Sequence, residues 1–308
     1  MKYSIGIDIG GTNIAVVLID ESGTVKYTNE RKTNYYGNDY LKNIVDLIAI
    51  AIQSVSCTVD GVGIGVPGTV DTLEGVVLRS PALKWENIPL KTYIENQFNL
   101  SAVIENDVNA WTMAEKVVGA GRESENFVMI TIGTGIGAGL YLNNRIYHGF
   151  GFEAGEIGYF PIGLEAYNYQ TLQEDFGFFE KKASARAVSQ SYYEKTMKKK
   201  DCKYIFELAR KKDEMAVLVT EEIYQYLGIG VSNIICILNP EKIILGGGMA
   251  QEGEIFLHKL KEKVERLIPM KTIFSLAETG SCGGAIGSGL LVFNQKDMGG
   301  YSLCSKKR

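Results

Sequence analysis

The feature that most constrains the fold is a pattern that occurs twice in the chain: an apolar strand, a glycine-rich turn and a second apolar strand. The first copy covers residues 3–20, with its turn at Gly10–Asn13, and the second covers residues 126–142, with its turn at Gly133–Gly137. Because the two copies are offset by roughly 120 residues, the repeat predicts two related lobes. Each lobe then begins with a hairpin that can supply one half of a phosphate clamp.

The turn of the first hairpin carries the chemistry expected of a phosphate-binding loop. Its glycines allow a ligand to approach the backbone, and its N–H groups and the side chains of Thr12 and Asn13 can bind phosphate oxygens. Asp8, two residues before the turn, can hold a hydrated metal ion. The turn differs from a Walker loop because a strand follows it and no Gly-Lys-Ser/Thr is present. An ordinary Gly-Gly hairpin turn is the alternative interpretation.

In the stretch 103–110, an apolar strand ends at Asp107 and a helix begins. In an α/β fold, ligands bind beyond the carboxyl ends of the strands, so Asp107 is placed to act as a catalytic base. Asp is also a favoured N-cap, and Asp107 could instead only cap the helix Val108–Lys116. The stretch by itself leaves both interpretations open.

Two further turns follow apolar strands. Residues 61–66 lead into Pro67 and Gly68, where the backbone can face a substrate or simply form a Pro-Gly turn. Residues 242–245 open onto Gly246–Gly248, where an adenine or ribose can lie flat against the backbone, with a plain tight turn as the alternative.

The remaining segments give a coarser prediction. Residues 72–90 are expected to be irregular and to cover a cleft, residues 160–162 to form a strand, and residues 163–177 to form a loop. Residues 118–122 break the periodic pattern and are the expected lobe boundary.

We therefore predict a smaller N-terminal lobe at residues 1–118 and a larger C-terminal lobe at residues 119–283. The helix near 284–295 could complete the first lobe, and residues 296–308 form a polar tail.

Composition excludes several classes of function. The net charge is only −4, and the short basic runs at residues 198–200 and 306–308 are too small for a nucleic-acid footprint. The N-terminal residues lack the features of a signal peptide, and no apolar run is long enough to span a membrane. The five cysteines are far apart and favour neither disulfides nor a zinc knuckle. A cytoplasmic protein without nucleic-acid or membrane partners is expected.

An ordered set of motifs gives the chain a family resemblance from about residue 3 to residue 293. The motifs are Asp8-Ile-Gly-Gly-Thr-Asn13, Val66-Pro-Gly68, Glu105-Asn-Asp107, Thr131-Ile-Gly-Thr-Gly-Ile-Gly137, Gly155-Glu-Ile-Gly158 and Leu245-Gly-Gly-Gly248. As a set, they resemble the sugar kinases of the ROK family (repressor, open reading frame, kinase). The resemblance implies an α/β, two-lobed ribonuclease H-like fold, as in actin and hexokinase, with ATP and sugar in a central cleft.

The resemblance also implies roles for individual residues. Asp107 would be the base that takes a proton from the attacking sugar hydroxyl, and Asp8 would position Mg²⁺ through water. Further sugar contacts would come from Gly68, Asn106, Glu156, Tyr159 and Glu180. ATP would contact Gly10, Gly11, Thr12, Asn13, Gly133, Thr134, Gly135, Gly246, Gly247 and Gly248. For Glu180, a solvated helix face is the alternative, and for Tyr159 it is a packed core tyrosine.

The chain departs from the family pattern on the sugar side. Many members bind zinc through the His of Gly-Glu-Ile-Gly-His and three Cys, but Tyr159 stands at the His position and residues 163–177 contain no Cys. We therefore predict no structural zinc. Ala82 also replaces an Asn that many members carry, which removes one sugar contact.

The resemblance thus predicts an ATP-dependent hexose kinase that acts on the 6-hydroxyl, with glucose as the simplest substrate. N-Acetylmannosamine and β-glucosides are the alternatives, because zinc-free members act on them. A sugar-responsive transcription regulator is less favoured, because such members carry a winged helix-turn-helix before the first hairpin, and here the hairpin starts at Tyr3. The resemblance favours a homodimer.

Overall fold

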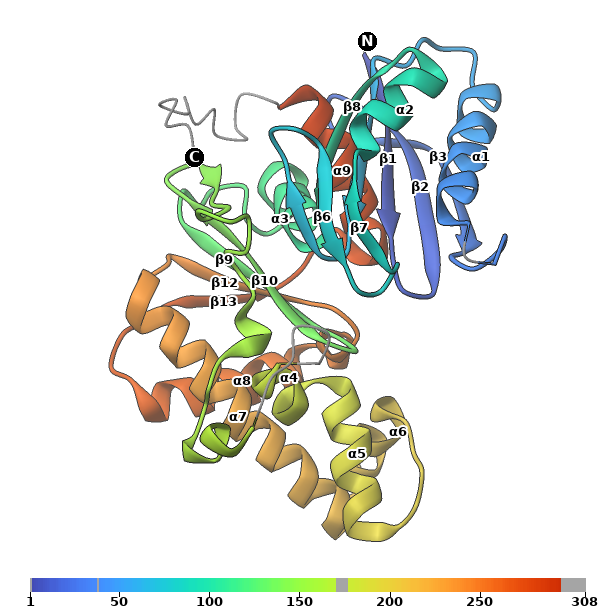
Figure 1. The fold of residues 1–308 in the computed structure, drawn as a ribbon. Coiled ribbons are helices and arrows are strands. Elements are labelled where there is room, and N and C mark those ends of the chain that lie inside the picture. Colours follow the sequence, from blue (N-terminus) through green and yellow to red (C-terminus); the bar gives the residue numbers. More distant parts are fainter. Residues whose placement is uncertain (1, 38, 170–176, 295–308) are drawn as a thin grey trace. The chain divides into compact units, whose positions relative to one another are not determined.

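The computed structural model describes residues 2–37, 39–169 and 177–294, and its contacts divide the chain into two compact units (Figure 1). Unit 1 comprises the described residues of Met1–Glu125, Gly139–Ala154 and Thr279–Arg308, and unit 2 comprises those of Asn126–Ala138 and Gly155–Glu278. The chain therefore passes between the units four times. The lobe boundaries at residues 118 and 283 stay predictions, and the expected tail at 296–308 lies outside the described residues.

Unit 1 is built on a five-stranded sheet in the order β3 (Val25–Lys32), β2 (Asn13–Asp20), β1 (Tyr3–Ile9), β4 (Gly61–Val66) and β8 (Ser101–Asn106). The first hairpin is confirmed, since β1 and β2 pair antiparallel from Tyr3–Asp20 to Ile9–Ile14. Strands β1, β4 and β8 are parallel to one another. Every residue of β4 is buried, as expected of a central parallel strand that is covered on both faces.

Helices cover both faces of this sheet. The side chains of Ile5 and Ile7 pack with α1 (Tyr40–Gln53) and α2 (Leu90–Phe98) in one core cluster. A second cluster contains α3 (Asp107–Val118) and α9 (Gly283–Phe293), the red helix of Figure 1. The core of unit 1 is thus layered, because alternate residues of a strand point to opposite faces.

Helix α9 approaches the sheet backbone to backbone. A Cβ on Gly63 of β4 would lie 1.7 Å from the carbonyl oxygen of Ser288, and one on Gly6 of β1 would lie 1.9 Å from that of Ala285. The hydroxyl of Ser4 donates to the carbonyl oxygen of Gly289 at 2.8 Å. Only glycine permits this contact, so the glycines of β1 and β4 form the seat of α9.

The prediction that residues 72–90 are irregular was wrong. They contain most of an antiparallel three-stranded sheet, β5 (Thr69–Asp71), β6 (Val76–Ser80) and β7 (Trp85–Ile88). The β6–β7 connection uses Lys84 and β7 contains Asn87, both at positive φ. Non-glycine residues at positive φ give no sequence signal of a hairpin, which explains the error.

The second five-stranded sheet has the order β11 (Arg145–Ile146), β10 (Ile136–Leu142), β9 (Phe127–Ile132), β12 (Lys242–Gly246) and β13 (Ile273–Leu276). Strands β9 and β10 are neighbours, so the second copy of the hairpin is confirmed. The predicted strand at residues 160–162 was wrong, because these residues have no regular secondary structure; the short 3-10 helix η1 (Ile157–Tyr159) ends just before them. Part of the expected loop 163–177, residues 170–176, lies outside the described residues; η2 (Leu164–Asn168) precedes it.

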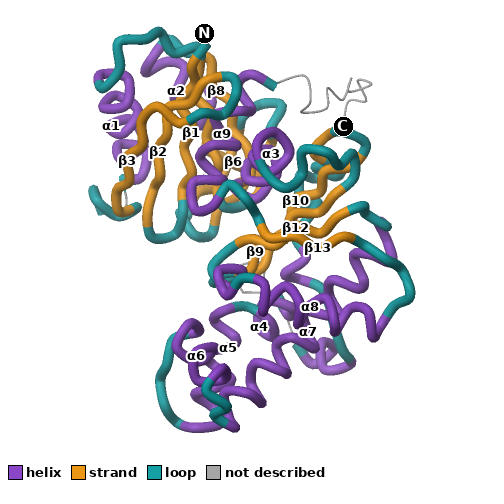
Figure 2. Tube along the Cα trace, turned by 180° about the vertical axis from the view of Figure 1, so that it is seen from behind, coloured by secondary structure: helices purple, strands orange, loops and turns teal. Residues whose placement is uncertain are grey.

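The rest of unit 2 is helical. Its helices are α4 (Phe178–Ala183), α5 (Ala185–Thr196), α6 (Cys202–Arg210), α7 (Glu214–Leu238) and α8 (Glu254–Leu267), with η3 (Met249–Glu252) before α8. Figure 2 shows α7 and α8 side by side, and the rings of Phe206, Tyr224 and Phe256 pack between α6, α7 and α8. Within the described residues, no helix is long and apolar enough to cross a membrane.

Candidate active site

The parallel strands of unit 1 bring several of the predicted site residues to one edge of the sheet. In the register, Asp8 lies opposite Gly65 of β4, and Val66 lies opposite Asn106 of β8. The carboxyl ends of β1, β4 and β8 therefore lie side by side, which is the edge of a parallel sheet where ligands usually bind. Asp8, Gly68, Asn106 and Asp107 thus belong to one edge.

The corner between β8 and α3 presents Asn106 and Asp107. Asn106 is the N-cap of α3, because its Oδ1 accepts hydrogen bonds from the N–H groups of Val108 at 2.9 Å and Asn109 at 3.0 Å. Asp107 is the first helical residue, and its Oδ1 accepts from Val108 at 2.9 Å. The interpretation of Asp107 as the helix cap is thus corrected, since Asn106 fills that position and leaves the Asp107 carboxylate available for chemistry.

Two carboxylates at this edge have perturbed pKa values. Burial raises the pKa of Asp107 from 3.8 to about 6, against the lowering effect of its backbone hydrogen bonds. Burial and the charge of Asp107 raise the pKa of Asp8 from 3.8 to about 7. A group of this kind is a candidate acid or base, because its pKa lies near the working pH of a cell.

The same two carboxylates fit a hard divalent cation. The negative charge of Asp107 raises the pKa of Asp8. A cation beside Asp8 would offset this repulsion and keep both carboxylates ionised. Carboxylate oxygens and water are the ligands that Mg²⁺ prefers. A Cβ on Gly284 would lie 2.5 Å from Oδ2 of Asp8, so this glycine lets the first turn of α9 come close to the carboxylate.

Gly68 is in contact with Asn106 at the end of β8 and with strand β6. Its carbonyl oxygen accepts a hydrogen bond from Nδ2 of Asn106 at 3.1 Å. Its φ is +126°, and a Cβ there would lie 2.2 Å from the carbonyl oxygen of Arg79 on β6. The hydroxyl of Ser80 donates to the Pro67 carbonyl oxygen at 2.5 Å. A glycine is therefore required at position 68 both by its conformation and by the close approach of β6.

The first glycine turn is held in shape by Thr33, which the sequence analysis missed. The hydroxyl of Thr33 donates to the carbonyl oxygen of Gly10 at 2.7 Å, and its N–H donates to that of Thr12 at 2.9 Å. Thr33 is buried. The side-chain amide of Asn13 donates to the carboxylate of Glu30. No sequence pattern marks Thr33, because its partners lie in the turn between β1 and β2, about 20 positions earlier in the chain.

Unit 2 brings the second glycine turn beside the Gly246–Gly248 stretch, because β9 and β12 are parallel neighbours. A Cβ on Gly133 would lie 3.9 Å from the N atom of Gly248. Gly247 has a φ of +86°, and a Cβ there would lie 2.6 Å from the carbonyl oxygen of Ile132. Thr134 is exposed at the tip of the turn. These backbone segments, which include the predicted Gly135, form one glycine-rich surface.

Glu180 connects this surface to α4. Its Oε1 accepts from the N–H of Ile136 at 2.7 Å, and its Oε2 accepts from the N–H of Gly177 at 3.0 Å. Burial raises the pKa of Glu180, although both hydrogen bonds act to lower it. The alternative of a solvated helix face was therefore wrong, since Glu180 braces the second turn against the start of α4.

Glu156 and Tyr159 lie at the two ends of the short helix η1. Glu156 is its N-cap residue and is exposed. Tyr159 is 41% exposed, so the alternative of a packed core tyrosine was wrong. Both side chains belong to the surface of unit 2.

Sequence reasoning also missed a buried pair beside the corner between β8 and α3. The side chains of Glu105 and His148 are both buried, and the Nε2 and Oε2 atoms lie 2.7 Å apart. The chain contains only two histidines, and one of them falls between the second hairpin and the Gly155-Glu156 motif, which was a usable signal.

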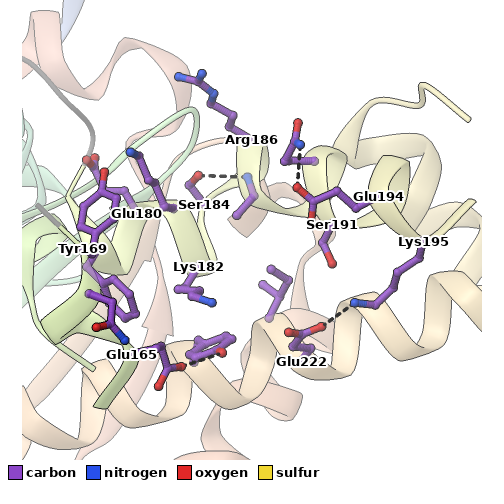
Figure 3. A pocket seen from close by; sticks show the side chains of 17 residues that line it. Glu165, Tyr169, Glu180, Lys182, Ser184, Arg186, Ser191, Glu194, Lys195 and Glu222 are labelled. Atoms are coloured by element: carbon purple, nitrogen blue, oxygen red, sulfur yellow. Dashed lines mark hydrogen bonds and ion pairs between the residues drawn. The ribbon is translucent and has the colours of Figure 1, made fainter. Parts of the chain in front are cut away.

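A cavity of about 540 Å³ lies within unit 2, between α4, α5 and α7 (Figure 3). Its lining includes Glu180, but its other charged groups are largely engaged with one another or with aromatic rings. Nζ of Lys195 lies 3.2 Å from Glu222, and Nζ of Lys182 lies over the rings of Phe178 and Tyr226. Positive and negative groups are mixed around the cavity, so its charge favours no particular class of ligand.

Within the described ranges, no three His, Cys, Asp or Glu side chains gather in the way that a metal cluster requires. The position of Mg²⁺ near Asp8, through water, stays a prediction; carboxylate oxygens and water are the ligands that this ion prefers.

Comparisons with known proteins find relatives along almost the whole chain. The profile of the ROK family matches residues 4–295. The chain is 29% identical to a glucokinase of Halalkalibacterium halodurans over 96% of each chain, and 30% identical to a xylose repressor of Caldicellulosiruptor bescii over 85% of this chain and 70% of the repressor. A solved structure of a ROK family glucokinase from Streptomyces griseus, in complex with glucose and AMPPNP, has a TM-score of 0.78 at 30% identity and covers 94% of this chain and 98% of its own.

Proposed function

Since the chain belongs to the ROK family and has its two-lobed, actin- and hexokinase-like fold, we propose that it is an ATP-dependent sugar kinase that transfers the γ-phosphate to a hexose hydroxyl. The observation that carries the proposal is the position of the Asp107 carboxylate. It lies near Asp8, at the edge of the sheet formed by the carboxyl ends of β1, β4 and β8. A glucokinase of the same family binds glucose and AMPPNP, which supports sugar and ATP as ligands here.

Each residue at the edge would have a distinct task. Asp107 would accept the proton of the attacking 6-hydroxyl, and its raised pKa makes it a stronger base than an ordinary carboxylate. Asn106 would bind a neighbouring hydroxyl, because its hydrogen bond to Gly68 uses only one of its two amide hydrogens. The backbone at Gly68 and the exposed Glu156 would bind further hydroxyls, each of which needs a partner once it is buried.

The glycine turns would hold the nucleotide. The N–H groups of Gly10–Asn13 and of Gly133–Gly135 are suited to phosphate oxygens, and Gly246–Gly248 leaves room for the adenosine. Asp8 would hold Mg²⁺ through water, and the ion would neutralise part of the phosphate charge. Catalysis would then rest mainly on positioning and charge stabilisation, as is general for phosphoryl transfer.

Glucose is the substrate that we favour, because glucokinases are among the relatives that match almost the whole chain. The absence of the Cys ligands and the presence of Tyr159 distinguish the sugar side from zinc-containing members. N-Acetylmannosamine and a β-glucoside are the alternative substrates, since Tyr159 stands where zinc-containing members carry a zinc-ligating His.

A coupled assay of ADP release tests the proposal directly. The panel contains glucose, N-acetylmannosamine, mannose, fructose, allose and cellobiose, each with ATP and Mg²⁺. We expect turnover on at least one hexose, and NMR of the product should show the phosphate on the 6-oxygen. Sugar binding without any ADP release would refute the kinase and favour a sugar-responsive regulator, to which the similarity to a xylose repressor points.

A further inference from the structure

Glu105 and His148 form a buried hydrogen-bonded pair in unit 1, immediately before the catalytic corner. Glu105 is fully buried, and 4% of His148 is exposed. Burial by itself lowers the pKa of His148, but the hydrogen bond and the negative charge of Glu105 outweigh it, so the net pKa is raised. An ionised carboxylate can only accept hydrogen bonds, so with Nε2 2.7 Å from Oε2 the geometry fits donation from the imidazole to Glu105.

The second carboxylate oxygen of Glu105 is engaged by the corner itself. Its Oε1 accepts from the N–H of Asn106 at 2.8 Å and from Nδ2 of Asn109 at 3.1 Å. The Oδ1 atom of Asn109 is buried and has no hydrogen-bond partner among the described residues. An unsatisfied buried oxygen costs stability, so the hydrogen bond from Asn109 to Glu105 is formed at the expense of the other end of the same amide.

His148 connects this network to another part of the chain. It follows β11, its carbonyl oxygen accepts from the N–H of Ala154 at 3.1 Å, and its ring lies edge-on to that of Phe152. Eight residues further along the chain is Glu156. The loop that leads to one proposed sugar contact is thus anchored, through His148, to the residue that precedes Asn106.

Stability alone does not account for such a pair. Two charged groups lose their hydration when they are buried, and apolar replacements of similar volume are often neutral or stabilising. A buried pair of this kind is therefore better explained by the geometry it imposes. Here Glu105 fixes the backbone N–H of Asn106 and the side chain of Asn109, on either side of Asp107.

We propose that His148 is a positioning residue: through Glu105 it sets the orientation of the Asn106–Asp107 corner, and hence the direction in which the base meets the substrate hydroxyl. The inference rests on the proposed kinase function, because it assigns His148 a role in that reaction. Its consequence is a loss in kcat that exceeds any loss in sugar binding, since a small misplacement of a base slows proton transfer far more than it weakens binding.

Two substitutions at the same position separate positioning from packing. His148→Phe keeps an aromatic ring but removes the donor to Glu105, and we expect kcat to fall about ten- to hundredfold, the scale of a displacement on the order of 1 Å. The sugar Kd, measured by calorimetry, should change less than about threefold. His148→Gln retains a donor and should recover most of kcat. Glu105→Gln, which keeps an acceptor for Asn106, should give an intermediate kcat.

Ile44→Ala is the control for lost stability. Ile44 lies in the core cluster with α1, on the face of the sheet opposite to α3. Its thermal midpoint should fall at least as far as that of His148→Phe while its kcat stays at the wild-type value. If His148→Phe lowers only the thermal midpoint and leaves kcat unchanged, the proposal is overturned. If His148→Phe does not fold, the comparison of His148→Gln and Glu105→Gln decides: equal, wild-type kcat values in both overturn it.

A readout without turnover keeps this inference separate from the kinase proposal. Carboxyl NMR of Asp107 follows its titration in the protein without ATP, and a reoriented corner should shift the midpoint in His148→Phe but not in Ile44→Ala. If wild type phosphorylates no sugar, the kinase proposal fails, and an unchanged Asp107 midpoint in His148→Phe would then also overturn the positioning role.

Discussion

Asp107→Asn should remove activity and at the same time stabilise the folded protein. The substitution keeps the shape of the side chain but removes its charge. If Asp107 is the base, kcat falls at least about a hundredfold, the usual loss for a general base. Near pH 8 the wild-type carboxylate is ionised in a buried position that opposes ionisation, and Asn avoids this cost.

The size of the gain follows from the pKa of Asp107, which rises from 3.8 to about 6 on folding. At about 1.4 kcal/mol per pKa unit, the cost of ionisation in the folded state is at most about 3 kcal/mol, and partial exposure of the carboxylate reduces it to about 1–2 kcal/mol. Loss of the charge also removes one cause of the raised pKa of Asp8, which adds to the gain.

The dependence on pH has a definite sign. Because the folded pKa lies above the unfolded one, the unfolded protein gives up the proton first, and the wild type loses stability as pH rises from about 4 to about 6. The advantage of Asp107→Asn should therefore be full above about pH 6 and absent below about pH 4.

Urea unfolding near pH 4 and near pH 8, without nucleotide or divalent cations, measures this difference. Asp20→Asn is the matched control, because the Ser22 hydroxyl and two backbone N–H groups lower the pKa of Asp20, although burial opposes them. The ionised Asp20 carboxylate stabilises the folded wild type above about pH 4, so Asp20→Asn should be less stable than wild type near pH 8. An Asp107→Asn protein that is no more stable than wild type near pH 8 would refute the reasoning.

Further outcomes are expected from the same structure. Thr33→Val removes the donor to Gly10 and should raise the KM for ATP about three- to tenfold at saturating sugar, with the sugar KM unchanged; an unchanged KM for ATP would contradict the role of Thr33. Gly63→Ala places a Cβ against the Ser288 carbonyl and should lower the free energy of unfolding by at least about 2 kcal/mol in urea titrations. kcat/KM for sugar should fall as pH drops through about 6, since Asp107 acts ionised. Metal analysis should find no stoichiometric zinc, and a zinc chelator should leave the thermal midpoint unchanged.

The sequence predicted those parts of the fold that depend on local pattern. Both hairpins were found because apolar strands on either side of clustered glycines leave a repeated signature. The edge that carries Asp8 and Asp107 followed from the rule that sites lie beyond the carboxyl ends of strands. Even there, the helix cap was assigned one residue too late, because Asn106 and Asp107 are both favoured N-caps and only the backbone conformation distinguishes them.

The parts that could not be predicted depend on contacts between distant segments. His148 lies 43 positions from Glu105, and Thr33 lies 23 positions from Gly10. Neither pair shares a helix or strand, so no periodicity links them. The hydrogen bond from the N–H of Ile136 to Glu180 could not be predicted, because the two residues are 44 positions apart. A side chain that hydrogen-bonds to the backbone of a distant segment produces no pattern in the sequence around it.

The seat of α9 on the glycines of β1 and β4 has a consequence for synthesis on the ribosome. Ser4 and its partner Gly289 are 285 positions apart, and nearly all of the nascent chain must emerge before α9 can reach the strands made first. Until then, the apolar face formed by residues such as Val17, Ile19 and Val103 has no cover from that helix. Closing so long a loop is slow, and an uncovered apolar face is a target for chaperones and for aggregation. The docking of α9 therefore determines when this apolar face of unit 1 is covered and no longer prone to misassembly.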